Sequence, residues 1–563
     1  MKRFFSIIHK EFNGINEAAF LLALFAFFSQ ILALVRDKSL AHFIGPSPTL
    51  DVYYAAFRVP DFIYTGIVSL ISITVLIPFL LEKTKGEDGN HEKLYRFLNE
   101  FLTVFSVAII VIDSAVFFAI PKLSSLIAPG FSGAERLQLI NVSRIMLLSP
   151  ILLGISNLFG ILTQIFRKFF IFALSPVFYN IGIIFGIYVL WPSLGIYGLA
   201  WGVVIGAFLH MLVQVPVLVK NRFTPRLVRK LDFRYIKQVI IFSLPRALAM
   251  GANSLSVIVL TALATNIAVG SVSIFNFSFS LQTIPLGIIG MSYAVAAFPI
   301  LTQLHTLGNL EDFKIKFVSA ARQIIFWAFP LTFLFIVLRA HIVRVILGSG
   351  SFSWSHTRLT AAAFAIFAIS IIAQSLLLLL ARGYYAAKNT SRPLVVNVFF
   401  SFLIIVLAYF FSWIFDSYAG VRYFLESLFR VDSIAGTKIL AIAFAYSVGT
   451  ILNCLALWYL FEKDFLKGYI APFRKTFFQS FVASFFIGFF AYGALSFFGN
   501  FFSLDTFWGV FLQAFFAGIF GITIGVWLLH VMKSEELSQV SSTLKHKFWK
   551  TQVVAEQQQE LLK

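Results

Sequence analysis

The stretch FWGVFLQAFFAGIFGITIGVWLLHVM, residues 507–532, decides the class of fold because it runs for 26 residues without an Asp, Glu, Lys or Arg. An α-helix needs about 20 apolar residues to cross the hydrocarbon of a bilayer. The strands of a membrane barrel alternate polar and apolar residues, and this stretch does not. The segment therefore predicts a transmembrane helix.

Thirteen similar apolar segments precede it, separated by short polar loops. The composition agrees, since 59% of the residues are hydrophobic and only 12% are charged, whereas about 25% are charged in an ordinary soluble chain. The predicted fold is an all-α integral membrane protein with 14 transmembrane helices. The predicted spans are residues 17–35, 54–81, 101–120, 142–165, 169–190, 196–218, 239–267, 273–301, 319–338, 359–380, 394–413, 439–461, 478–498 and 507–532.

The basic residues give the orientation. Of the 44 Lys and Arg residues, 31 lie in the N-terminal segment and every second gap after it, and ten lie in the other gaps. Cytoplasmic loops of membrane proteins carry this excess, so both termini are predicted to be cytoplasmic. The same pattern accounts for most of the net charge of +19 without a nucleic-acid partner. Residues 1–16 are predicted as a cytoplasmic surface helix, 219–238 as a basic cytoplasmic linker and 533–563 as a cytoplasmic tail.

An internal repeat predicts two lobes. Residues of the same type recur at an offset of 221: Gly66-Ile67 with Gly287-Ile288, Pro78 with Pro299, and Phe131 with Phe352. We therefore expect an N-lobe over residues 17–218 and a C-lobe over 239–461, each of six helices in parallel repeat, with two extra helices over 478–532. A chance coincidence of Gly and Pro in apolar sequence is the alternative.

Three arginines, Arg58, Arg144 and Arg246, fall within or at the ends of predicted spans. A charge at mid-membrane costs about 3 kcal/mol, so it usually faces a cavity or a partner. Arg246 follows Pro245, which kinks a helix, and it has no acidic residue nearby in the sequence, which favours a functional role. Arg144 is expected to be interfacial and structural.

A dense polar cluster surrounds Arg58: Arg36, Asp37, Asp51 and Asp61. Guanidinium groups match the geometry of phosphate oxygens, so the cluster favours a water-filled cationic cavity for an anionic headgroup. The alternative is a set of internal ion pairs that hold helices together, such as Asp37 or Asp61 with Arg58.

Several kinds of chemistry are excluded by missing motifs. The chain has no GxxxxGK[ST] motif for ATP phosphates, no HxxxH or HExxH pair, and a single cysteine, Cys454. We therefore expect no catalytic residues, no metal site, no disulfide and no cofactor. Transport would draw on a gradient or a partner.

Several motifs resemble those of a known family, in order along the chain. They are residues 29–37 (SQILALVRD), 43–45 (FIG), Asp51, 56–60 (AFRVP), 128–131 (APGF), 175–176 with Asn180, 244–246 (LPR), 275–277 (FNF), 281–282 with Pro285, 350–352 (GSF) and 382–393 (RGYYAAKNTSRP). The sequence is similar to the MurJ/MviN family of lipid II flippases, within the multidrug/oligosaccharidyl-lipid/polysaccharide exporter superfamily. The resemblance covers residues 17 to 400 and, by topology, extends to 532.

The resemblance implies a multi-pass protein of the bacterial cytoplasmic membrane whose spans 1, 2, 7 and 8 line a central cationic cavity. Such a protein carries undecaprenyl-pyrophosphate-linked peptidoglycan precursor, lipid II, to the outer leaflet by alternating access, with the lipid tail beside spans 13 and 14. It is not an enzyme. Its partners are lipid II, membrane lipids and cell-wall synthesis proteins, and its energy source is a monovalent cation or the membrane potential.

The resemblance and the local chemistry together give a set of expected site residues. The cavity residues are Arg36, Arg58, Arg246, Gln30, Asn276 and Gln282; the charge partners are Asp37, Asp51 and Asp61; the cytoplasmic family motif contributes Arg382, Tyr385, Lys388, Arg392 and Pro393. The chain departs from the family where members carry further arginines, at Gln30, Tyr64 and Ser280. Arg246, Asn276 and Gln282 are expected to supply replacement donors.

Three alternatives remain open. The departures at the arginine positions leave room for a flippase of another polyprenyl-linked glycan. A drug exporter of the same superfamily would need an acidic cavity for cationic drugs. A membrane glycan-assembly enzyme or a scaffold would need an outside loop with paired carboxylates. The longest predicted outside loop, residues 414–438, holds Asp416, Glu426 and Asp432 without a recognisable motif.

Overall fold

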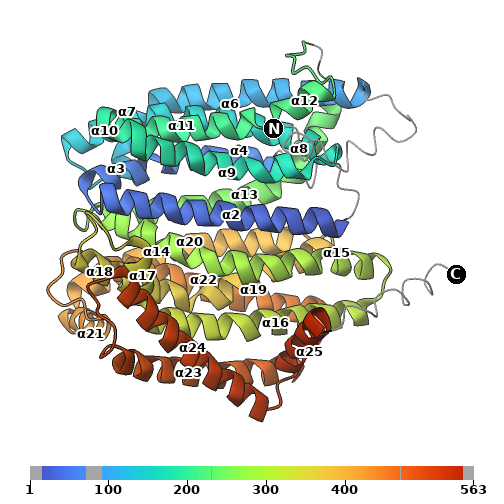
Figure 1. Cartoon of the computed structure of the whole chain (residues 1–563). Coiled ribbons are helices and arrows are strands. Elements are labelled where there is room, and N and C mark those ends of the chain that lie inside the picture. Colours follow the sequence, from blue (N-terminus) through green and yellow to red (C-terminus); the bar gives the residue numbers. More distant parts are fainter. Residues whose placement is uncertain (1–14, 71–91, 230, 232, 470, 550–563) are drawn as a thin grey trace. The chain divides into compact units, whose positions relative to one another are not determined.

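The computed structural model describes residues 15–70, 92–229, 231, 233–469 and 471–549, which form helices and loops without a β-strand (Figure 1). Within these residues, eleven helices are long and apolar enough to cross a membrane. The pair α18 (Trp354–Ile369) and α19 (Ile371–Ala386), which is bent by 42°, makes a twelfth if the two helices count as one span. The prediction of an all-α membrane fold is confirmed.

The count of 14 spans stays a prediction. The first predicted span lies in α2 (Ile15–Phe43), a 29-residue helix whose C-terminal half carries Arg36, Asp37 and Lys38. Part of the second predicted span, with Pro78 of the repeat, lies outside the described residues. The same holds for residues 1–14 of the predicted surface helix and 550–563 of the predicted tail.

The chain folds as two compact units, which are described separately. Unit 1 comprises residues 1–279, 346–363 and 390–449, and unit 2 comprises 280–345, 364–389 and 450–563. The predicted lobe boundaries at 218 and 239 stay a prediction.

Unit 1 contains most of the N-terminal helices. After α2 come α3 (Pro48–Ala56), α4 (Arg58–Leu70), α6 (Glu92–Ile127), α7 (Gly133–Met146), α8 (Leu148–Ile165), α9 (Phe169–Phe185), η1 (Gly186–Leu190), α10 (Trp191–Leu194), α11 (Ile196–Leu212), α12 (Val215–Lys220), α13 (Phe233–Thr265), α20 (Ser391–Ser417) and α21 (Ala419–Phe429). It also holds the first part of α14 (Ser271–Pro285), of α18 and of α22 (Ile439–Phe461).

Unit 2 contains the remaining helices. They are η2 (Leu286–Met291), α15 (Ser292–Thr306), α16 (Leu310–Val337), α17 (Arg339–Leu347, of which the last two residues belong to unit 1), α19, η3 (Glu462–Leu466), α23 (Ala471–Phe498), α24 (Phe507–Val531) and α25 (Glu535–Trp549). The second parts of α14, α18 and α22 complete it.

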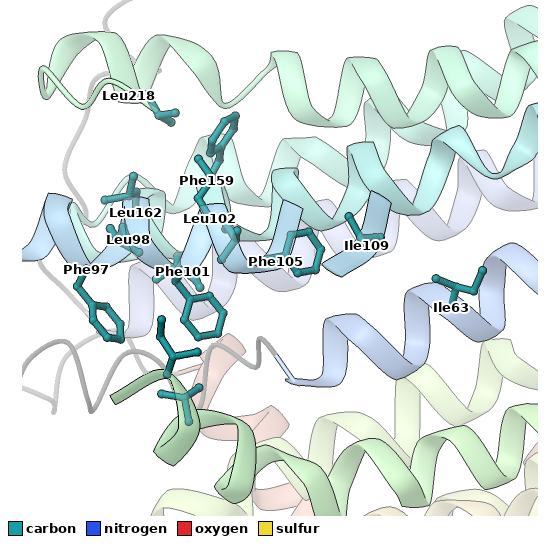
Figure 2. Close-up of a cluster of buried hydrophobic side chains, with 14 of the residues drawn as sticks. Ile63, Phe97, Leu98, Phe101, Leu102, Phe105, Ile109, Phe159, Leu162 and Leu218 are labelled. Atoms are coloured by element: carbon teal, nitrogen blue, oxygen red, sulfur yellow. The ribbon is translucent and has the colours of Figure 1, made fainter. Parts of the chain in front are cut away.

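The core of unit 1 lies around one face of α6. Phe97, Phe101, Phe105 and Ile109 recur every four residues, so they share a face of that helix. All four are buried, and they pack with apolar residues of α4, α8, α12 and α13 (Figure 2). This face of α6 therefore joins five helices into one packed region.

Helices α9 and α11 approach each other through glycines. A Cβ atom added at Gly182 would lie 2.2 Å from the Cα of Gly206, and one at Gly186 would lie 2.5 Å from the Cα of Gly202. Both pairs have the four-residue spacing that lets membrane helices pack backbone to backbone. This packing fixes α9, which lies alongside α2 and carries Asn180.

Two loop contacts of unit 1 agree with the predicted repeat. The N–H of Ser351 donates to the carbonyl of His42 at the end of α2, at 2.9 Å. The N–H of Gly130 donates to the hydroxyl of Thr265 at the end of α13, at 3.2 Å. Gly130 and Ser351 differ by the repeat offset of 221, and each loop contacts the first helix of the other repeat. Such reciprocal contacts are expected of two repeats related by a two-fold axis.

Candidate substrate-binding site

Arg36 lies in the C-terminal part of α2 and is held by two neighbours. Its Nε donates to Asp37 Oδ1 at 2.9 Å, and its Nη1 donates to Asn180 Oδ1 on α9 at 3.3 Å. The amide of Asn180 in turn donates to the hydroxyl of Ser29, at 3.2 Å. The side chain of Arg36 remains 25% exposed, whereas that of Asp37 is 8% exposed. Arg36 is therefore oriented by an ion pair and still accessible.

Arg58 begins α4 and has a neutral partner. Its Nη2 donates to Asn276 Oδ1 on α14 at 2.5 Å, and the amide of Asn276 donates to the carbonyl of Val272 at 2.7 Å. Among the described residues, Arg58 Nε has no hydrogen-bond partner, and no carboxylate lies within ion-pair distance of the guanidinium. Arg58 therefore keeps its positive charge unpaired, which a pre-formed anion site requires.

Asp51 is a buried acceptor for the start of α14. One carboxylate oxygen accepts the N–H of Gly270 at 2.6 Å, and the other accepts the N–H and the hydroxyl of Ser273 at 2.7 and 2.6 Å. A carboxylate at a helix N-terminus satisfies free N–H groups and complements the helix dipole. The predicted charge partner thus contacts backbone and hydroxyl donors, and it ties α3 to α14.

Asp61 lies one turn into α4, and its side chain is exposed. Arg58 and Arg36 are the cations that interact with it electrostatically. Tyr64, at a position where the family usually carries arginine, accepts a hydrogen bond from the amide of Asn157 on α8 at 3.0 Å. Gln30, on α2, is half-buried. Two cations and one exposed acid therefore gather in unit 1, with neutral polar groups around them.

Two predicted cavity residues remain, Arg246 and Gln282. Arg246 lies on α13, one residue after Pro245, and its side chain is outside the described part of the structure. Gln282 is buried in unit 2, where its Oε1 accepts from the amide of Gln374 at 2.9 Å. The same amide of Gln374 donates to the hydroxyl of Ser370, at the bend between α18 and α19.

The cytoplasmic family motif joins α19 to α20. Lys388 adopts a left-handed conformation with φ of +57°, which ends α19, and Pro393 lies in the first turn of α20, where it needs no intrahelical N–H partner. Arg382 Nη2 lies 3.1 Å from Met291 Sδ. Tyr385 and Arg392 also make contacts. These motif residues shape a connection between helices.

A motif residue that was not predicted as functional anchors this connection. The hydroxyl of Tyr384 donates to Asp464 Oδ2 at 3.0 Å, and its fully buried ring packs edge-on against Phe461. The polar partners Asn157, Asn180 and Ser273 were also missing from the predicted cavity residues. Their asparagine and serine side chains are common in helices, so the sequence offered no signal beyond the family match at Asn180.

The fold and this site define a multi-spanning helical membrane protein that presents accessible arginines within its bundle. The family profile described as "Lipid II flippase MurJ" matches residues 40–512, so the chain belongs to that family. The resemblance predicted from the motifs is confirmed.

Relatives and solved structures agree with this assignment. A probable lipid II flippase MurJ of Borreliella burgdorferi is 25% identical over 469 residues, covering 79% of this chain and 89% of the relative. The lipid II flippase MurJ of Burkholderia cenocepacia is 24% identical, covering 66% and 74%. The solved structure of a lipid II flippase MurJ in an inward closed conformation has a TM-score of 0.69 at 20% identity, covering 92% and 99%.

A second solved structure places the fold in a wider group. An inward-facing multidrug resistance MATE family transporter of the MOP superfamily has a TM-score of 0.60 at 13% identity, covering 78% of this chain and 95% of that chain. At this identity the likeness concerns the fold alone.

Proposed function

We propose that this chain moves lipid II from the inner to the outer leaflet of the bacterial cytoplasmic membrane, for cell wall synthesis. Family membership over residues 40–512 supports the substrate class. The observation that carries the proposal is Arg58, whose guanidinium has an amide partner and, among the described residues, no carboxylate within ion-pair distance. Its charge is available to a pyrophosphate.

The physical requirements for moving a pyrophosphate across a membrane fit this arrangement of charges. A pyrophosphate cannot cross hydrocarbon alone, so a protein must supply a wet, positive path while the prenyl tail stays in lipid. Binding must also be weak enough for release. Arg36, half-neutralised by Asp37, together with Arg58 near the exposed Asp61, gives a moderate positive charge. Alternating access then exposes these groups to each leaflet in turn.

The remaining features of the proposal follow from the same reasoning. The chain is a multi-pass membrane protein, and we place both termini in the cytoplasm on the charge asymmetry of its loops. It acts as a transporter without a catalytic step or a bound cofactor. An inside-negative potential would favour outward movement of an anion by about 2.3 kcal/mol per charge per 100 mV, and a monovalent cation could add to this. Cell-wall synthesis proteins are its expected partners.

Complementation tests the proposal. The chain would be expressed in a bacterium depleted of its own lipid II flippase, with survival and outer-leaflet lipid II as readouts. We expect rescue by the native chain, loss of rescue in Arg36→Gln, and loss in Arg246→Ala if that arginine supplies donors from the second repeat. Arg422→Gln is the matched control, because Arg422 contacts the ring and hydroxyl of the adjacent Tyr423 on α21. Failure of the well-expressed native chain to export lipid II would overturn the proposal.

One observation favours a second candidate. Tyr64 stands at a usual arginine position, and its hydroxyl is engaged by Asn157 at 3.0 Å instead of facing a phosphate. A neutral site here suits another polyprenyl-linked glycan whose headgroup offers more hydroxyls. Transport of such a lipid by purified protein in vesicles, with no transport of lipid II, would establish this alternative.

A further inference from the structure

Asp113 is an acid in the middle of an apolar membrane helix. It lies in α6, 19 residues after Leu94 and 14 before Ile127, the limits of an apolar span of 34 residues. With a rise of about 1.5 Å per residue, at least about 20 Å of helix separate it from either end. An acid at this depth is a candidate functional group by default.

The surroundings of Asp113 are apolar. Its residue is 5% exposed, and it shares a face of α6 with Ile109 and Ile120, which are 0% and 2% exposed, and with the half-buried Val116. These neighbours belong to the apolar core of unit 1, in which Figure 2 labels Ile109, four residues before Asp113 in the sequence. Leucine would be the ordinary residue at such a position.

Neither carboxylate oxygen of Asp113 has a hydrogen-bond partner among the described residues. A carboxylate buried in this way without a donor would be strongly unfavourable, whereas the neutral acid costs far less. The contrast with Glu100 on the same helix is direct. Glu100 is 3% exposed, yet its carboxylate accepts from Arg96 Nε at 3.1 Å, so it can stay ionised. Asp113 has no such cation.

One cation lies near it without touching it. Arg144 on α7 donates to the carbonyl of Phe117 at 3.3 Å and lies 4.5 Å above the ring of that residue. Phe117 is one turn beyond Asp113, a step of about 5.4 Å along the helix. Arg144, expected from the sequence to be a structural residue, therefore contacts α6 one turn away from Asp113.

The other helices packed against α6 define the rest of the electrostatic environment. α8 carries no Asp, Glu, Lys, Arg or His between residues 148 and 165. The ionisable groups on the packed elements are Glu135, Arg136 and Arg144 on α7, Arg58, Asp61 and Tyr64 on α4, and Arg234, Tyr235, Lys237 and Arg246 on α13. Within the described residues no cluster of three or more His, Cys, Asp or Glu side chains could hold a metal ion.

We propose that Asp113 is a proton-binding site of unit 1. In the packed arrangement its carboxyl group holds a proton on one oxygen. When α6 and α7 part enough to admit water, the O–H bond breaks, the proton leaves to that water, and Arg144 moves one turn from Phe117 to pair with the carboxylate. A single carboxylate in apolar surroundings binds a proton, because a metal cation would need several oxygen ligands. On the proposed function, this site couples lipid movement to a proton gradient.

Infrared difference spectra test the site independently of transport. The purified full-length protein in lipid would be compared between about pH 5 and pH 9, the range over which a buried carboxyl can titrate. We expect a protonated-carboxyl band that disappears at high pH, is absent in Asp113→Asn and persists in Glu100→Gln. A spectrum without such a band, or a band retained in Asp113→Asn, would overturn the proton site.

Flipping in vesicles tests the coupling. An imposed pH gradient should change the rate of lipid II movement severalfold in the native chain and in Glu100→Gln, and should leave the rate in Asp113→Asn unchanged while basal movement continues. An equal response in Asp113→Asn would overturn the coupling. If the native chain shows the infrared band but moves no lipid II, the proposed function fails and the proton site stands.

Discussion

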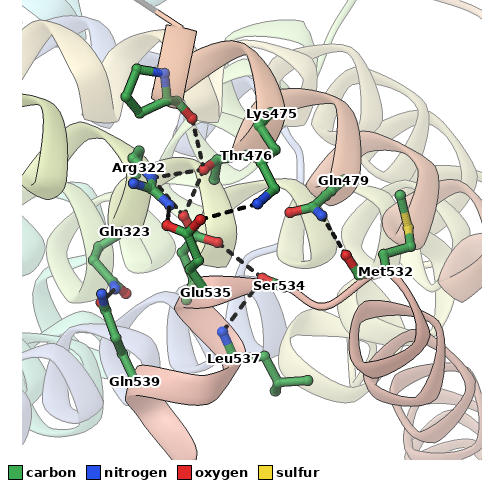
Figure 3. A network of polar contacts seen from close by, with 12 residues as sticks. Arg322, Gln323, Lys475, Thr476, Gln479, Met532, Ser534, Glu535, Leu537 and Gln539 are labelled. Atoms are coloured by element: carbon green, nitrogen blue, oxygen red, sulfur yellow. Dashed lines mark hydrogen bonds and ion pairs between the residues drawn. The ribbon is translucent and has the colours of Figure 1, made fainter.

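Two arginines of this chain, Arg58 in unit 1 and Arg322 in unit 2, show opposite ways of accommodating a guanidinium. Arg322 on α16 donates to Glu535 at 2.5 Å, to Glu536 at 2.7 Å and to the hydroxyl of Thr476 at 2.8 Å (Figure 3). Arg58 has the amide of Asn276. The charge of Arg322 is compensated by carboxylates of the protein, whereas among the described residues Arg58 has no carboxylate within ion-pair distance.

We propose that this difference separates structural from functional arginines. The partners of Arg322 lie on α25 and α23, so the network attaches the helix that follows the last membrane span to the bundle. Ser534 and Thr476 also donate to Glu536, which is 2% exposed. A network whose polar groups all have hydrogen-bond partners is rigid, whereas an arginine with free hydrogen-bond donors can exchange partners.

Removing the charge of Arg322 should have the largest effect. In Arg322→Gln the buried Glu536 loses its cation, so the docking of α25 should weaken by about 3 kcal/mol. Hydrogen exchange of the α25 backbone amides would measure this as faster exchange, with the other helices unchanged. Unchanged protection of α25 would show that Thr476 and Ser534 alone hold Glu536. Arg322 would then not be a structural arginine, and the comparison with Arg58 would fail.

Arg58→Gln should do the reverse of Arg322→Gln: it should reduce lipid II movement and leave stability nearly unchanged. The amide can still donate to Asn276, so thermal stability should stay near that of the native chain, while lipid II movement should fall about tenfold, the equivalent of about 1.4 kcal/mol. Arg58→Lys is the matched variant, because it keeps the charge and loses the planar fork, and it should fall between the two. Flipping rates in vesicles give the measurement. A large loss of stability with normal transport by the folded fraction would make Arg58 structural.

The comparison also shows what the sequence could predict. Apolar windows placed the helices well: the predicted span 507–532 corresponds to α24, Phe507–Val531, and 439–461 matches α22. The predicted span 101–120 proved to be part of a 36-residue helix, Glu92–Ile127, since a helix continues beyond the hydrocarbon that its composition reveals. Burial in lipid leaves a strong compositional signal, and helix ends outside lipid do not.

The site was predictable in part. Arg36 with Asp37 is a neighbouring pair, so its ion pair follows from the sequence. The partner of Arg58 lies 218 residues away, at Asn276; the resemblance placed both residues in one cavity, but no sequence pattern indicated the hydrogen bond between them. Asp113 was absent from the predicted site, although it is the only acid in residues 101–120. Asp113 is a candidate because its buried carboxylate has no hydrogen-bond partner among the described residues. No sequence pattern shows the absence of such a partner.

Substitution of Asp51 tests whether this predicted charge partner acts as a hydrogen-bond acceptor that holds the start of α14. Asp51→Asn keeps one acceptor oxygen for Ser273 but turns an N–H group towards that of Gly270, so we expect a loss of about 1 kcal/mol in stability. Thermal unfolding and lipid II movement should be measured on the same preparation. Transport that falls in proportion to the folded fraction would confirm a helix-capping role. A greater loss of transport would restore Asp51 to the charge partners predicted from the sequence.

The smallest effect is expected at the exposed edge of the Arg322 network. Glu535 is half-exposed, and hydrogen bonds from Arg322 and Lys475 hold its pKa below the usual 4.5. For Glu536 burial acts to raise the pKa, but hydrogen bonds from Thr476 and Ser534 and the charge of Arg322 outweigh it, so its pKa is also lowered.

A lowered carboxyl pKa stabilises the folded state above the unfolded pKa, and the stabilisation disappears as the pH falls through the folded value. Protection of α25 against hydrogen exchange should therefore be constant at neutral pH and should decrease below about pH 4, relative to the reference value for Glu. Glu535→Gln should shift this profile little at neutral pH, because exposed pairs contribute about 0–1 kcal/mol. Glu536→Gln removes the buried negative charge and one of the two acceptor oxygens, so it should weaken the docking of α25 already at neutral pH. If both variants behave alike, burial does not distinguish the two acids, and the strength of the network depends on Arg322 itself.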